Sequence, residues 1–124
     1  MNIQKIGQIG VPVKDVERAI HFYRDLLGLK LLFNTDNMAF FQCNDIRLLL
    51  SLPEKEEFAK TSSVIYFQVD NIEESYDDLN QKGVPFTGEP HRIAKIKETE
   101  TWMAFFKDSE DNTLALMSEV TDQD

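Results

Sequence analysis

A pattern repeated at about half the chain length is the feature that most limits how this sequence can fold. The segments "VKDVERA" and "VDNIEES" align with each other, so that Val16 of the first matches Ile72 of the second. The glycines that follow, Gly28 and Gly83, correspond to within one residue. Self-similarity at a fixed spacing indicates that one supersecondary unit occurs twice.

Each copy has the pattern of a βαβββ unit. Apolar residues alternate in the strand that opens "GQIGVPVKD", and Asp15 is a suitable N-cap for the helix that follows it. In the second copy Asn71 has the same role, with Glu74 completing a capping box, and Gly28 and Gly83 are expected to end the two helices. The predicted helices are 16–28 and 72–83, and the predicted strands lie within 7–15 and at 29–33, 38–43, 46–52, 64–70, 84–88, 101–108 and 113–118.

These elements predict an α+β fold of two tandem βαβββ modules, which form a curved mixed sheet around a cleft. We expect 124 residues to make one domain, with module 1 at about 1–53, a connection at 54–62, module 2 at 63–120 and a short acidic tail. A unit this small cannot cover both faces of its sheet, so the helices are expected to protect one face and leave the other open. A cleft beside such open faces is a natural small-molecule site.

Composition narrows the class of partner. The net charge of −9 argues against nucleic acid, because phosphate binding needs clustered Lys and Arg. The sequence shows neither a long apolar run nor a signal peptide, so we expect no membrane contact and a cytoplasmic location. Cys43 is the single cysteine, and we interpret it as a small apolar residue.

The chain resembles the vicinal oxygen chelate superfamily, which includes glyoxalase I, the fosfomycin and bleomycin resistance proteins and extradiol dioxygenases. The resemblance rests on "V-x-D-x-x-x-A-x-x-F-Y-x-x-x-L-G-L", which begins at Val13, and on a degraded form of "D-P-D-G-N-x-x-E-L". In that second motif Ser109 stands for the Pro and Asp111 for the Gly. The resemblance implies the fold predicted above and, in many members, a divalent metal ion.

The metal-ligand positions of the family are occupied here by the wrong residue types. The resemblance places the ligands at Gln8, Leu49, Val64 and Ala115, where metal-dependent members carry His or Glu. Zinc, nickel, manganese and iron need several His, carboxylate or thiolate ligands. We therefore expect neither a metal ion nor another cofactor at these positions.

The open faces give a list of candidate ligand-binding residues. Gln8 either hydrogen-bonds a ligand or bonds a neighbouring side chain or water, and both interpretations stay open. Tyr66 and Phe105 either stack on a planar ligand or fill space, and Arg47 either pairs an anionic group or is an ordinary exposed arginine. By strand parity the expected wall consists of Gln8, Gly10, Arg47, Leu49, Ser51, Val64, Tyr66, Gln68, Met103, Phe105, Thr113, Ala115 and Met117.

The segment 91–102 carries few apolar residues and both charge signs, so it is expected to form a hairpin loop or lid over the cleft. Trp102 shares its parity with Ala104 and Phe106 and is assigned to the core. The two histidines, His21 and His91, fall outside the inherited metal positions and are expected at the surface.

Three functional hypotheses follow. The preferred one is a metal-free protein that binds or sequesters a small molecule, as the bleomycin resistance group does. Its ligand would be a cationic or aromatic compound such as an antibiotic, and the resemblance implies a homodimer. The second is a metal-dependent lyase, transferase or dioxygenase with relocated ligands such as His91, Glu89 or Glu119. The third is a cofactor-free enzyme that uses Tyr66 or Arg47.

Overall fold

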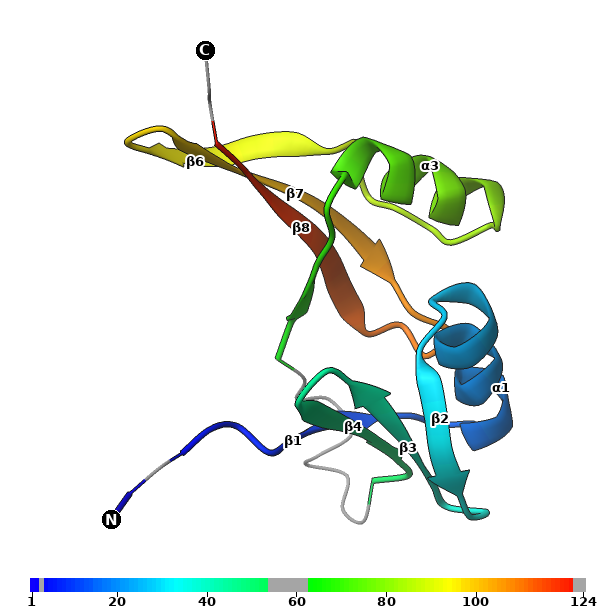
Figure 1. The fold of residues 1–124 in the computed structure, drawn as a ribbon. Coiled ribbons are helices and arrows are strands. Elements are labelled where there is room, and N and C mark those ends of the chain that lie inside the picture. Colours follow the sequence, from blue (N-terminus) through cyan, green and yellow to red (C-terminus); the bar gives the residue numbers. More distant parts are fainter. Residues whose placement is uncertain (3, 54–62, 122–124) are drawn as a thin grey trace. The chain divides into compact units, whose positions relative to one another are not determined.

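The computed structural model describes residues 1–2, 4–53 and 63–121, and Figure 1 traces its elements along the chain. By contacts the chain divides into two compact units, unit 1 at Met1–Ser62 and unit 2 at Ser63–Asp124. The elements are β1 Gln8–Pro12, α1 Val16–Ile20, η1 His21–Leu26, β2 Lys30–Asn34, β3 Met38–Cys43, β4 Ile46–Ser51, β5 Ile65–Gln68, α3 Ile72–Gln81, β6 His91–Ile96, β7 Thr99–Lys107 and β8 Thr113–Thr121.

The two units share one topology. The sheet of unit 1 has the strand order β1-β4-β3-β2, and the sheet of unit 2 has the equivalent order β5-β8-β7-β6. The pairs β1–β4 and β5–β8 are parallel, and all other strand pairs are antiparallel. The α+β fold with tandem βαβββ modules is confirmed.

The helix of unit 1 begins and ends where the sequence predicts. The Asp15 side chain accepts a hydrogen bond from the Arg18 backbone N–H at 3.1 Å, as an N-cap does. Gly28 follows the helix with a φ of 79°. The helix itself changes character, because α1 gives way at His21 to the π-helical turn η1.

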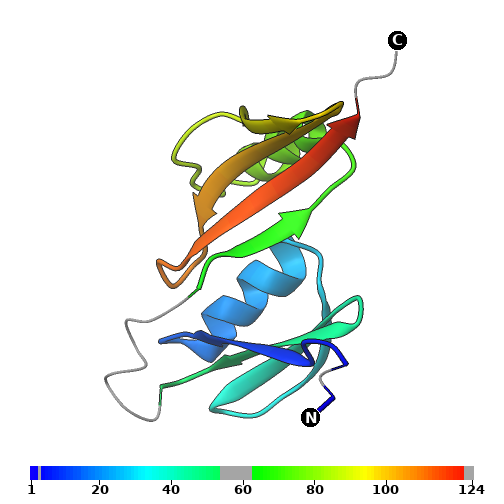
Figure 2. The same ribbon diagram turned by 90° about the vertical axis from the view of Figure 1, so that its left-hand side faces the viewer.

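One face of the unit 1 sheet is covered by its helix, as Figure 2 shows for α1 behind the strands. The Tyr23 ring is fully buried and lies 5.9 Å from the ring of Phe41 on β3, centroid to centroid. Buried on the same side are Val11, Val13, Val16, Ala19, Ile20, Phe22, Ala39, Leu48 and Leu50. Burial of this apolar surface drives the helix onto the sheet.

Unit 2 repeats this arrangement with α3 alongside β7 and β8 (Figure 1). The Asn71 side chain accepts from the Glu74 backbone N–H at 3.1 Å, and Gly83 has a φ of 88°. A series of aromatic rings joins the helix to the sheet. The ring centroid of Phe86 lies 4.7 Å from that of Tyr76 on α3 and 5.1 Å from that of Phe106 on β7.

Three assignments from sequence differ, wholly or in part, from the structure. The predicted strand at 84–88 is a connection with one isolated bridge, Phe86 to Phe106, and the strand of this module is β6 instead. The segment 91–102 forms a hairpin, as expected, but most of it is strand and not loop, because it belongs to the paired strands β6 and β7. Trp102 is half-buried rather than fully buried, and its indole N–H donates to Glu100 Oε1 at 3.1 Å.

Within 1–2, 4–53 and 63–121, none of the helices has both the length and the apolar composition needed to cross a bilayer.

Candidate functional site

The open face of the unit 1 sheet carries three rows of side chains set by strand register. The first row runs Gln8, Arg47, Gln42 and Lys30, the second runs Gly10, Leu49, Phe40 and Phe33, and the third runs Pro12, Ser51 and Met38. The first row is polar and cationic, and the second is mainly apolar. The predicted residues Gln8, Arg47, Leu49 and Ser51 all lie on this face.

Gln8 and Arg47 are bound to each other across the parallel pair β1 and β4. Arg47 Nε donates to Gln8 Oε1 at 2.9 Å, and the guanidinium carbon lies 5.4 Å from the centroid of the Phe40 ring. A guanidinium over an aromatic face is attracted by the ring quadrupole. Gln8 therefore bonds a neighbouring side chain, which is one of the two interpretations open from sequence, and it orients Arg47 in doing so.

Two aromatic residues of this face are missing from the sequence-based wall. Phe33 and Phe40 stack with centroids 4.7 Å apart and an interplanar angle of 24°, and Phe33 is 56% exposed. The signal for Phe40 was present in the sequence, since it alternates with Met38 and Gln42 on β3. The wall was predicted without β2 and β3, so both rings were overlooked.

The open face of the unit 2 sheet is also aromatic. Tyr66, Ala115 and Phe105 lie in one row, and the rings of Tyr66 and Phe105 meet edge to face with centroids 6.1 Å apart. The next row holds Gln68, Met117, Met103 and His91. The Lys107 ammonium donates to Thr113 Oγ1 at 2.8 Å at the end of the face.

One predicted wall residue, Ala115, has surroundings that differ from the expectation. Ala115 is fully buried between Tyr66 and Phe105 in register, so its methyl group supports the rings and offers no surface to a ligand. Val64 precedes β5 and is 36% exposed. Tyr66 and Gln68 are exposed, and Met103, Phe105, Thr113 and Met117 are half-buried, so these six residues have surface on the face.

The side chains at the positions where the family resemblance places metal ligands do not suit a divalent ion. Leu49, Val64 and Ala115 have no side-chain atom that could bind a metal, and Gln8 offers only its amide. Its oxygen faces the Arg47 guanidinium at 2.9 Å, where a second cation would be repelled. An ion beside Gln8 would find one neutral oxygen there and no ligand atom at Leu49 of the same sheet, whereas such metals need several anionic or imidazole ligands.

The relocated ligands considered from sequence do not form a metal-binding group among the described residues. His91 Nδ1 and the backbone oxygen of Glu89 form a hydrogen bond at 3.1 Å, with the ring nitrogen as donor. Glu119 lies two strands away in a different row, paired with Thr101, and two strand spacings amount to about 10 Å. Among the described residues, no three His, Cys, Asp or Glu side chains are grouped so that they could hold one metal ion.

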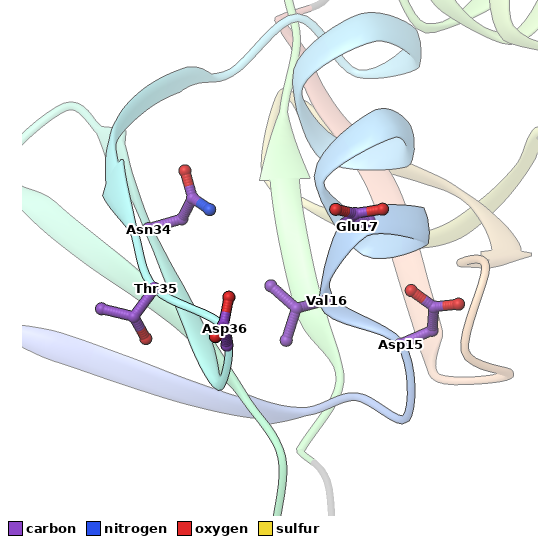
Figure 3. A pocket seen from close by; sticks show the side chains of 6 residues that line it. All are labelled: Asp15, Val16, Glu17, Asn34, Thr35 and Asp36. Carbon is purple, nitrogen blue, oxygen red and sulfur yellow. The ribbon is translucent and has the colours of Figure 1, made fainter.

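A hollow of about 220 Å³ lies elsewhere in unit 1, between the start of α1 and the turn after β2 (Figure 3). It is lined by Asp15, Val16, Glu17, Asn34, Thr35 and Asp36. Three carboxylates make this hollow acidic, and Asp15 is already engaged as the N-cap of α1. None of the predicted site residues lines it.

Comparison with known proteins identifies the family. Residues 5–116 match the profile of the Glyoxalase/Bleomycin resistance protein/Dioxygenase superfamily. The chain therefore belongs to this superfamily, which is the vicinal oxygen chelate group to which its motifs are similar.

Three individual proteins illustrate the range of the family. "Uncharacterized protein YraH" of Bacillus subtilis (strain 168) is 29% identical over 126 residues, which cover 90% of this chain and 96% of YraH. Metallothiol transferase FosB of Staphylococcus saprophyticus is 30% identical over 87 residues, but these cover 66% of this chain and 58% of FosB. The crystal structure of TnmS3, an antibiotic binding protein from Streptomyces sp. CB03234, superposes with a TM-score of 0.78 at 21% identity, covering 97% of this chain and 99% of TnmS3.

Proposed function

We propose that this chain is a metal-free protein that binds or sequesters a small molecule through the open faces of its sheets. The observation that carries the proposal is the hydrogen bond between Arg47 Nε and Gln8 Oε1. This bond places the Arg47 guanidinium against Gln8 Oε1, at the position where the family resemblance places a metal ligand. A position built in this way favours ligand recognition by hydrogen bonds over metal chemistry.

The aromatic surface of unit 2 supports the choice of a small organic ligand. The Tyr66 ring is 45% exposed beside Phe105, and two methionines continue the face in the next row. Aromatic and thioether groups with a few polar neighbours are typical of small-molecule pockets. A fold shared with an antibiotic binding protein agrees with such a ligand, and we propose an antibiotic or a similar aromatic compound.

The decisive experiment measures metal and ligand separately. Protein purified without chelator is analysed for metal content and then titrated with nickel, zinc, manganese and iron(II) by calorimetry. We expect less than stoichiometric metal and no saturable binding of these ions. A panel of aromatic antibiotics is then titrated in the presence of EDTA, with Tyr66→Ala as the test variant and Tyr66→Phe as its matched control.

The expected result is saturable binding in EDTA that weakens in Tyr66→Ala and persists in Tyr66→Phe, because the ring and not the hydroxyl provides the contact. One tightly bound metal per chain would overturn the proposal. Conversion of a compound in EDTA, lost in Tyr66→Ala or Arg47→Ala, would replace binding by cofactor-free catalysis.

Similarity to a metallothiol transferase favours a second candidate, a metal-dependent enzyme of this superfamily with relocated ligands. It requires His91, Glu89 and Glu119 to approach one another, and β7 lies between β6 and β8 in the register described above. The metal titration tests this candidate directly, with His91→Ala as the variant that would lose the ion.

Location and assembly complete the proposal. We propose a cytoplasmic protein that forms a homodimer, as expected from the resemblance to its family. Light scattering during gel filtration gives the mass in solution, and a value near 14.4 kDa at all concentrations would rule out the dimer. Cell fractionation tests the location.

A further inference from the structure

Arg47 differs from two other arginines of the chain in what neutralises it. Arg24 Nε donates to Asp25 Oδ1 at 2.9 Å, and Arg92 Nη1 lies 3.6 Å from Glu100 Oε2. Arg47 has a neutral amide in place of a carboxylate, and no carboxylate of the described residues lies within ion-pair distance of it. Among the described residues, its positive charge therefore has no carboxylate partner, in a chain whose net charge is −9.

The guanidinium is also held in a defined position. Gln8 Oε1 on β1 accepts the hydrogen bond from Arg47 Nε, and the Phe40 ring on β3 lies beneath the guanidinium. Because the bond to Gln8 uses Nε, the two terminal nitrogens can still form a bidentate pair with an incoming carboxylate. An arginine positioned by an amide and a ring before binding loses less side-chain entropy when it binds.

An apolar surface begins immediately beside this charge. The row after Arg47 contains Leu49 and the stacked pair Phe40 and Phe33, and Phe33 closes the row on the edge strand β2. The two rows are two residues apart along each strand, which amounts to about 7 Å. Lys30 adds a second positive charge in the row of Arg47, two strands away, at about 10 Å.

We propose that the open face of the unit 1 sheet binds a small aromatic carboxylate, with the carboxylate on the Arg47 guanidinium and the ring against Phe33 and Phe40. This inference rests on the proposed metal-free binding function and names its ligand class. The net charge of the chain as a whole, −9, would by itself favour a cationic ligand. The charge at the face itself favours the opposite sign, because contact energies depend on the nearest groups.

The experiment uses three probes of one shape. In EDTA, 2-naphthoate (anionic), 2-naphthamide (neutral) and 2-naphthylmethylammonium (cationic) are titrated into the full chain and followed by protein NMR shifts. We expect the naphthoate to bind about tenfold more tightly than the naphthamide, as a charge-assisted bidentate bond predicts. The cation should bind most weakly, and added salt should reduce the difference.

Three variants separate charge from ring. Arg47→Gln should remove the preference for the naphthoate and leave the naphthamide unchanged. Phe33→Ala should weaken the naphthoate and the naphthamide by a similar factor. Arg92→Gln is the matched control, because it removes the same charge from a position that is already paired with Glu100. It should change the affinity of neither probe. All three positions are exposed, and thermal unfolding checks that each variant folds.

The outcomes distinguish this inference from the proposed function. Equal affinity for naphthoate and naphthamide, or an Arg47→Gln variant that keeps the preference, overturns the carboxylate assignment and leaves metal-free binding standing. Absence of saturable naphthoate binding also overturns the assignment. Binding of the probes that appears only after a metal ion is added would overturn the proposed function itself.

Discussion

Gly28 and Gly83 hold the same conformation at the ends of the two corresponding helices, with φ angles of 79° and 88°. Both lie in the left-handed region, which L-residues with a Cβ rarely adopt. After Gly83 the Val84 N–H donates to the Leu79 carbonyl at 3.0 Å, and the Gly83 N–H donates to Asn80 at 3.1 Å, which together form a Schellman motif. The helices of both modules therefore depend on glycine to stop.

We expect Gly28→Ala and Gly83→Ala each to lower the free energy of unfolding by about 1 kcal/mol. A Cβ at either position would meet no atom within 4 Å, so the cost comes from the backbone conformation and not from a clash. Gly88→Ala is the control, because Gly88 has equal space and no positive φ. Urea denaturation measures all three, and equal stability of the Gly88 and Gly83 variants would contradict the explanation.

The N-cap of α3 gives a second stability prediction. Asn71→Ala removes the acceptor of the Glu74 N–H and should cost about 1 kcal/mol of unfolding free energy. Asn71→Asp should retain most of the stability because it keeps the acceptor. Asn80→Ala is the matched control in the exposed part of the same helix and should be neutral or slightly stabilising. Thermal melts followed by circular dichroism test the set, and a loss in the Asn80 variant would argue against a cap effect.

Ser118 on β8 is 1% exposed, and its hydroxyl finds no hydrogen-bond partner among the described residues. Burial of an unpaired hydroxyl costs free energy, so we expect Ser118→Ala to stabilise unit 2 by about 1 kcal/mol. Thr113→Val removes a hydroxyl from the same strand that does accept a bond, from Lys107 Nζ. That control should show no gain. Chemical denaturation decides, and a loss of stability in Ser118→Ala would indicate that the hydroxyl has a partner.

Asp25 on η1 gives a prediction for pH. Hydrogen bonds from Arg24 and from His21 favour its charged form and hold the pKa of this carboxyl below its usual range. The folded pKa lies below the unfolded one, so the stabilisation is present above the unfolded value of about 3.9 and is lost as pH falls through the folded pKa. Arg24→Ala should move the pKa of Asp25 upward. An NMR titration of the carboxyl carbon measures this shift, and an unchanged midpoint would contradict it.

Sequence patterns predicted those parts of the fold that local chemistry decides. Asp15, Asn71 and the two helix-ending glycines were identified because caps and left-handed residues have specific side-chain requirements. Asp111 stands where the family motif has Gly, and its φ of 66° shows that the turn keeps the conformation that Gly would supply. Aspartate tolerates this region better than most residues do.

The sequence-based predictions fail where the pairing of strands decides the structure. The polar strand β6 is held by its register with β7, while the apolar segment 84–88 contributes Phe86 to the contacts between α3 and the sheet. In β2 a bulge shifts the register between Leu31 and Phe33, so that Leu31 pairs with buried Phe41 and Phe33 pairs with Phe40. Parity cannot be followed across a bulge, because the extra residue reverses the face.

The one-residue mismatch between the two copies has a structural cause in η1. Val16 to Gly28 is one residue longer than Ile72 to Gly83, and the extra residue falls in the helix that becomes π-helical at His21–Leu26. The Leu27 N–H donates to Phe22 at 3.0 Å, five residues back, as π-helical bonding requires. A π-turn is therefore how this helix accommodates an insertion.

Deletion of one residue from η1 should then convert the turn to a regular α-helix. We expect the chain without Asp25 to fold and to lose only the small stabilisation of its exposed pairs with Arg24 and His21. Deletion of exposed Asp78 from α3 is the control, because the helix there has no extra residue and the shift would displace Leu79, which is buried. That deletion should cost roughly 3 kcal/mol or more. Equal losses in the two deletions would show that η1 is required by the fold of unit 1 and is not an accommodated insertion.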